Sequence, residues 1–275
     1  MTMSILNNIP SMAAQNQLSN TQNNLQKTLF ELASGSRINS GADDAAGLAI
    51  ADGLQANIMA LNQSQLNAND GVGQMQVTDG ALAQVTTLLN RAVTLATEAG
   101  TGTVNSTQRV ALDTEFTAIK AEIDRIGADT TFNNTSVFCS TTTSIFLSDA
   151  NASSSITVSV GALAASSIGT VTNLAGDDLL TDTGSQAALT DINNAIAQVA
   201  ALRGQVGAAM NRLQAASNVE STQVQNLTSA EDGITAANIA STVADMSKYN
   251  ILESTGMSAL AQANSSQQSV LQLLR

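Results

Sequence analysis

The sequence predicts a mainly α-helical protein: an elongated coiled-coil or helical bundle with paired N- and C-terminal helices and a small β-hairpin region at its tip. Three observations support this class. Apolar residues recur every seven positions over long stretches, which is typical of packed helices. The single proline, Pro10, leaves everything after it free to be helical. The chain has 275 residues, no Trp, one Tyr and five Phe, so its core must be aliphatic.

The N-terminal helix is expected to have a narrow apolar stripe. Residues 1–26 carry no charged side chain and are rich in Asn and Gln. Leu18, Leu25, Leu29 and Leu32 follow a seven-residue repeat with a 4/3 step, which indicates one helical face. Such a helix is marginal when isolated, so we expect it to need a partner helix.

The C-terminal end has the same character. No charged side chain occurs between Glu253 and Arg275. The apolar positions expected in its assembly seam are Met257, Leu260, Leu271 and Leu274. Because the two ends match, the sequence predicts that they pair as one coiled-coil domain formed by residues 1–44 and 236–275.

A hinge is predicted where the first helix ends, formed by Arg37, Asn39, Asp43 and Asp44. Glycine, serine and asparagine between residues 35 and 41 interrupt the helical period. Asp43 and Asp44 stand where the next helix would begin, and we expect them to cap its N-terminus. The alternative is that they bind a cation or form an ion pair, for example with Arg37.

Residues 45–235 are predicted to form a helical rod domain. Its first helix has a seam that repeats every seven residues, at Leu54, Leu61, Ala68, Met75, Leu82, Leu89 and Ala96. A shorter helix follows the glycines at 100 and 102, and the short loop favours an antiparallel hairpin. A third helix with a 3/4 frame runs from Leu189 to Ile234.

The segment 132–185 within this domain differs in composition. Ile156, Val158 and Val160 alternate with hydroxyl residues, which indicates a half-buried strand, and Ile145 and Leu147 are the expected partner. Two features leave alternatives open. The Ser/Thr-rich stretch 140–185 is either O-glycosylated or plain solvated surface. The single cysteine, Cys139, is either a reactive surface thiol or a small buried hydrophobe.

Composition excludes several classes of function. The chain has no histidine, the most common general base and metal ligand, so we expect no enzyme, no catalytic residue, no metal site and no cofactor. The net charge of −12 argues against nucleic-acid and anionic-membrane partners. The first residues lack the pattern of a cleaved signal peptide, so we expect any export to use another route.

Several motifs resemble those of one protein family, the bacterial flagellins. They occur in the family's order: SGSRINSGADDAAGLAIA (34–51), NANDG (67–71), EIDRI (122–126) followed by TFN (131–133), NLTSA (226–230) and AQANSSQQSVLQLLR (261–275). The resemblance covers about residues 1–135 and 186–275, with a short middle segment. One departure is Glu231, which stands where flagellins usually carry a basic residue, and this weakens any expected family ion pair at the hinge.

The resemblance implies a secreted, extracellular structural subunit that polymerises with itself into the helical flagellar filament and serves motility. The resemblance also implies that the chain is exported unfolded through the flagellar type III apparatus. Its further partners would be an export chaperone and the hook-associated and cap proteins. Arg91, Leu95 and Glu115 match positions at which many flagellins are read by Toll-like receptor 5; ordinary subunit packing is the alternative. A hook–filament junction protein and a soluble secreted coiled-coil effector are the competing interpretations of the whole chain.

Overall fold

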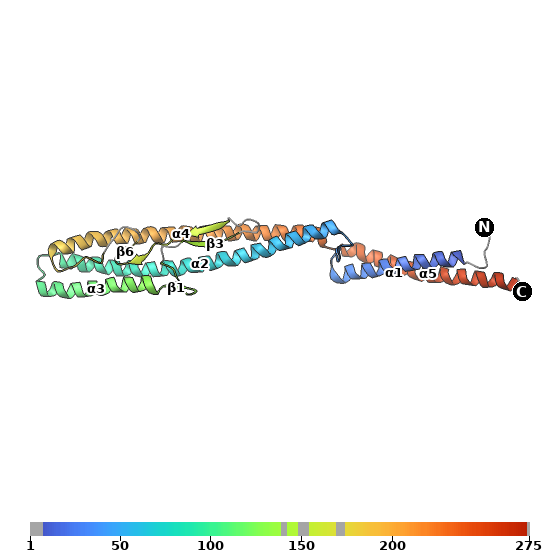
Figure 1. Cartoon of the computed structure of the whole chain (residues 1–275), viewed down its shortest axis with the longest axis horizontal. Coiled ribbons are helices and arrows are strands. Elements are labelled where there is room, and N and C mark those ends of the chain that lie inside the picture. The colour runs from blue at the N-terminus through green and yellow to red at the C-terminus, as the bar shows by residue number, and fades with distance from the viewer. Residues whose placement is uncertain (1–7, 139–141, 148–153, 169–173, 274–275) are drawn as a thin grey trace. The chain divides into compact units, whose positions relative to one another are not determined.

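Seven-residue repeats build the longest helices of the structure, a computed structural model that describes residues 8–138, 142–147, 154–168 and 174–273 (Figure 1). The chain divides into two compact units. Unit 1 comprises Met1–Ala56 and Asn226–Arg275, and unit 2 comprises Asn57–Gln225. The described residues are mainly α-helical, with paired terminal helices and small antiparallel strand pairs in the middle of the chain, which confirms the predicted fold class.

Unit 2 is built on α2 (Ala45–Ala99), α3 (Ser106–Asp129) and α4 (Asp182–Thr235), of which α2 and α4 continue into unit 1. The predicted seam of α2 is buried at Leu61, Ala68, Met75, Leu82, Leu89 and Ala96. The same spacing is buried on α4 at Ile192, Val199, Val206 and Leu213. All of these side chains except Leu61 join one hydrophobic core with Phe116, Ile119 and Ile123 of α3.

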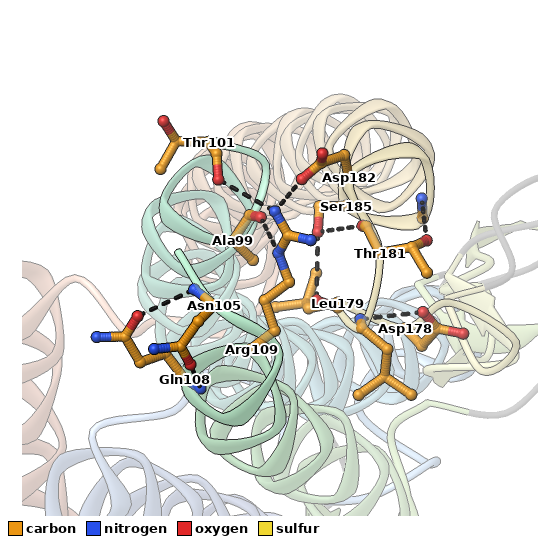
Figure 2. Close-up of polar contacts among 12 residues, drawn as sticks. Ala99, Thr101, Asn105, Gln108, Arg109, Asp178, Leu179, Thr181, Asp182 and Ser185 are labelled. Carbon is orange, nitrogen blue, oxygen red and sulfur yellow. Dashed lines mark hydrogen bonds and ion pairs between the residues drawn. The ribbon is translucent and has the colours of Figure 1, made fainter. Parts of the chain in front are cut away.

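Arg109 joins the helix ends at one end of unit 2 (Figure 2). Its guanidinium donates hydrogen bonds to the carbonyl oxygens of Ala99, at 2.9 Å, and Thr101, at 3.1 Å. It also forms an ion pair with Asp182, the first residue of α4. The side chain is only 13% exposed. Arg109 therefore links the end of α2, the first turn of α3 and the start of α4.

The described residues of unit 2 include three antiparallel strand pairs. They are β1 (Thr131–Phe132) with β2 (Thr135–Ser136), β3 (Thr143–Phe146) with β4 (Ser155–Val158), and β5 (Leu163–Ala164) with β6 (Ser167–Ile168). The turn between β1 and β2 consists of Asn133 and Asn134, both with positive φ, as a two-residue hairpin turn of type I′ requires.

The β3–β4 pair is the hairpin predicted from the sequence, with Ile145 opposite Ile156. It lies beside α2, where the Asn67 side-chain amide donates to the Phe146 carbonyl oxygen at 3.2 Å, rather than at the tip of the bundle. Ile145 and Val158 are buried in the common core. A position beside the helices lets the hairpin bury these side chains, which explains its place.

Unit 1 contains α1 (Ile9–Ser34) and α5 (Ile239–Leu273), which lie side by side and antiparallel (Figure 1). Asn8 caps α1 by accepting from the Ser11 amide, and its own side-chain amide donates to the Ala263 carbonyl oxygen at 3.3 Å. Gly35 ends α1 in the left-handed conformation, at a φ of 68°, which glycine adopts without strain. In the described part of the chain no helix is long and apolar enough to cross a membrane.

Candidate assembly surface

On α1, threonines alternate with half-buried leucines along the face that contacts α5. Among the described side chains of these two helices, the buried ones are Thr21, Thr28 and Thr242. Each threonine hydroxyl donates to a main-chain carbonyl four residues earlier in its own helix, so none carries an unsatisfied donor into the contact. Leu18 and Leu25 are half-buried beside them. The pair therefore buries little apolar surface and gains little stability from its own contact.

The apolar side chains of unit 1 are mostly on its outside. Among the described residues of unit 1, the buried hydrophobic side chains are Ile38 and Ala51, and neither lies on α1 or α5. The exposed large hydrophobic side chains are Ile9, Met12, Leu29, Phe30, Ile50, Ile239, Val243, Ile251, Leu252 and Met257. Nine of these ten side chains lie on the paired helices α1 and α5, and such a concentration of exposed apolar side chains indicates contact with another protein.

Some residues of the predicted terminal seam are half-buried, and others are exposed. Leu18, Leu25, Leu32 and Leu260 are half-buried, whereas Leu29 and Met257 are exposed. Leu29, at 46% exposure, lies beyond the narrow stripe that faces α5, because the threonines occupy the second contact position. The side chain of Leu271, together with Leu274 and Cys139, lies outside the described residues.

Asp43 organises the loop that follows α1. Lys27 Nζ lies 2.8 Å from Asp43 Oδ1, and Asp43 Oδ2 accepts from the main-chain amides of Asn39 and Ser40 at 3.3 and 3.1 Å. These hydrogen bonds, of which that from Lys27 is the strongest influence, lower the pKa of Asp43 to about 2. Sequence reasoning missed Lys27, although it is the first charged residue of the chain.

The other predicted hinge residues separate into a helix cap and a bridge. Asp44 Oδ1 accepts from the Gly47 amide at 2.8 Å, which confirms that Asp44 caps α2. Arg37 forms no ion pair with these aspartates; its guanidinium donates to the Ile234 carbonyl oxygen at 2.7 Å, and its amide donates to that of Thr235. Asn39 donates from its side-chain amide to the Ser36 carbonyl oxygen at 3.0 Å. This bridge joins the hinge to the last turn of α4.

Arg91 and Glu115 lie together on the surface of unit 2. Arg91 Nε is 2.7 Å from Glu115 Oε1, and a second hydrogen bond of 3.0 Å makes the pair bidentate. The guanidinium lowers the pKa of the Glu115 carboxyl. Leu95, in contrast, is only 1% exposed and belongs to the core. The surface predicted for receptor recognition is therefore reduced to Arg91 and Glu115.

Two family models match the chain in sequence order. The bacterial flagellin N-terminal helical region matches residues 5–143, and the bacterial flagellin C-terminal helical region matches residues 189–274. The first match covers α1, α2 and α3 with the hinge between α1 and α2, and the second covers most of α4 and all of α5.

Similar proteins cover the chain almost completely. Flagellins of Halalkalibacterium halodurans and Bacillus subtilis are each 34% identical, over 99% of this chain and 100% of their own. A flagellar filament 33 kDa core protein of Treponema phagedenis is 31% identical with the same coverage. The crystal structure of Bacillus cereus flagellin matches with a TM-score of 0.50 and 30% identity, over 60% of this chain and 94% of that chain. Together, the two family regions and the full-length relatives show that the chain belongs to the bacterial flagellin family.

Proposed function

We propose that this chain polymerises with copies of itself through the exposed apolar faces of α1 and α5. Membership of the flagellin family makes it a structural subunit of the flagellar filament, an extracellular appendage. The proposal adds the surface: residues 1–44 and 236–275 form the inner coiled-coil core of the filament, and residues 45–235 form the outer helical bundle.

The distribution of apolar side chains supports this proposal. Helices α1 and α5 bury threonines against each other and leave Ile9, Phe30 and Ile251 in solvent. Ordering about 60 residues of helix costs conformational entropy that so small a contact repays poorly. Neighbouring copies that cover the exposed side chains supply the missing burial. Heterologous contacts that do not close into a ring then produce an open helical polymer.

A substitution at Phe30, which is 70% exposed, tests this surface. Phe30→Asp places a charge where a neighbour would pack, so we expect no long filaments in electron micrographs of seeded monomer. Phe30→Leu keeps an apolar side chain and should polymerise as the unchanged chain does. Filaments of normal length from Phe30→Asp would refute the proposed surface, and short capped stubs from the unchanged chain would favour a hook–filament junction role.

The route to the filament is the second part of the proposal. We infer that the chain travels unfolded through the flagellar type III apparatus with an export chaperone, and that hook-associated and cap proteins meet it at the filament. The weak burial within unit 1 suits a chain that must stay unfolded until it reaches its neighbours. The test is the amount of this protein in culture supernatant from cells with and without a functional export apparatus; equal amounts would exclude this route.

We further infer that Toll-like receptor 5 reads Arg91 and Glu115. Both side chains are about half exposed, and their bidentate geometry fixes their positions. Binding of the receptor ectodomain to monomers should weaken in Arg91→Ala. The matched control is Arg125→Ala, on the neighbouring surface of α3. Equal binding by Arg91→Ala and the unchanged chain would refute the assignment.

A further inference from the structure

One face of α3 carries a stripe of polar residues that no part of the proposed function uses. Asp113, Lys120, Asp124 and Gly127 follow one another at intervals of seven, four and three residues, so they lie on the same side of the helix. The stripe faces the middle segment of the chain, whose described residues 163–168 and 174–179 we call the strap. Strand β5, within the strap, packs against α3.

Three side chains of the stripe bind the main chain of the strap. Asp124 Oδ1 accepts from the Ala165 amide at 2.6 Å, and Asp113 Oδ1 accepts from the Leu179 amide at 2.9 Å. Lys120 Nζ donates to the Asp177 carbonyl oxygen at 2.6 Å. Main-chain groups are the same in every residue except proline, so these three contacts do not depend on the identity of the strap side chains.

The fourth stripe residue, Gly127, lets the strap main chain touch the helix. A Cβ atom at this position would stand 1.7 Å from the Leu163 carbonyl oxygen, which no pair of real atoms tolerates. The strap main chain therefore contacts the α3 backbone at Gly127 and forms hydrogen bonds with three charged side chains of the same helix.

The strap side chains include buried anchors and exposed positions. Leu163, Ile168, Leu174 and Leu179 are buried and join the common core. Ser166 and Ala175 are exposed. The contacts with Asp113, Lys120 and Asp124 thus use the main chain of the strap and none of its exposed side chains.

We propose that α3 is a docking site for an extended main chain, which holds the strap whatever side chains its outer surface carries. The ligand chemistry is two main-chain N–H groups, one main-chain carbonyl and apolar anchors. The family models agree with such a division: α3 lies inside the first matched region, and the strap lies between the two regions, where neither matches. The outer surface of the strap can consequently change without loss of the bundle beneath it.

Amide hydrogen exchange, followed by NMR on the full-length monomer, tests each contact separately. Asp124→Ala should speed exchange of the Ala165 amide by about tenfold or more and leave Leu179 unchanged, because a lost local hydrogen bond raises local opening. Asp113→Ala should speed exchange of the Leu179 amide and leave that of Ala165 unchanged. Asp129→Ala removes an exposed carboxylate from the same helix and should change neither amide. Unchanged exchange at both amides in the first two variants would overturn the proposal.

A variant changed only on the outer surface of the strap tests the same contacts if Asp113→Ala and Asp124→Ala unfold unit 2. Ser166→Lys combined with Ala175→Lys alters the outer surface and leaves α3 and the anchors intact. The proposal requires that Ala165 and Leu179 exchange within about twofold of their original rates, because their main-chain partners are unchanged. Rapid exchange at both amides would show that the outward side chains hold the strap, and the main-chain docking site would be refuted.

Discussion

The Lys27 ammonium contacts the Asp43 carboxylate at 2.8 Å, so the last turns of α1 are tied to the loop that leads into α2. The same carboxylate accepts the amides of Asn39 and Ser40. A single side chain therefore fixes both the end of the first helix and the path of the hinge.

This arrangement predicts how the hinge responds to acid. The pKa of Asp43 is lowered from 3.8 to about 2, so its contribution to hinge stability is fully present above about pH 4 and is lost as the pH falls through about 2. Exchange of the Asn39 and Ser40 amides should therefore be accelerated over this range, beyond the intrinsic pH dependence of exchange. In Asp43→Asn, exchange of these two amides should be accelerated already at neutral pH. Asp52→Asn removes an exposed charge from the same part of the chain and should behave like the unchanged protein.

The Arg109 contacts predict a clear loss of stability when they are removed. Arg109→Ala leaves the carbonyl oxygens at the end of α2 without their partner, and we expect the free energy of unfolding to fall by about 1–3 kcal/mol in urea titrations. Arg125→Ala, on the same helix but 59% exposed, should cost less than about 0.5 kcal/mol. Equal losses in the two variants would mean that Arg109 is an ordinary surface residue.

Gly127 predicts a departure from helix propensity. Alanine in place of glycine within a helix usually stabilises by about 0.5–1 kcal/mol, and Gly204→Ala in α4, where no atom lies within 4 Å of the new Cβ, should do so. Gly127→Ala should instead destabilise unit 2, because the Leu163 carbonyl oxygen must move. The comparison is made by chemical denaturation of both variants. Stabilisation by Gly127→Ala would contradict the close approach of the strap.

Two leucines from predicted seams should behave differently in the monomer. Leu82 is fully buried, so Leu82→Ala should cost about 2–5 kcal/mol of unfolding free energy. Leu29 is largely exposed, so Leu29→Ala should change monomer stability by less than about 1 kcal/mol. Filament assembly can be measured as the fraction of protein that sediments. Leu29→Ala should lower this fraction although its monomer is intact. Normal polymerisation of Leu29→Ala would remove Leu29 from the assembly surface.

Long regular repeats were the part of this fold that could be predicted. The α2 seam from Leu61 to Ala96 is buried as expected, because one heptad pattern persists there without interruption. The pairing of α1 with α5 followed from the matching composition of the two ends. In α4 the pattern was less informative: Glu220, a charged residue within this helix, is buried and accepts a hydrogen bond from the Ser64 hydroxyl at 2.8 Å.

Contacts between distant residues outside the repeats could not be predicted. Arg109 and Asp182 are 73 residues apart in the sequence, and much of the segment between them has no helical period. The hydrogen bonds of the α3 carboxylates could not be predicted either, because a sequence does not show which main-chain amides will lie against them. In the terminal pair, the heptad pattern indicated a leucine seam, but it could not show that threonines would occupy its centre and leave Leu29 outside.

The most buried side chains between α1 and α5 are threonines, whereas large apolar side chains such as Phe30 and Ile251 remain on the surface of the pair. Under the proposed assembly, how well the terminal helices of a subunit are ordered depends on the position of that subunit in the polymer. A subunit deep in the filament has neighbours on all sides and is held firmly. A subunit just added to the growing end has fewer neighbours and remains the least ordered, so the growing end stays adaptable while the shaft behind it becomes rigid.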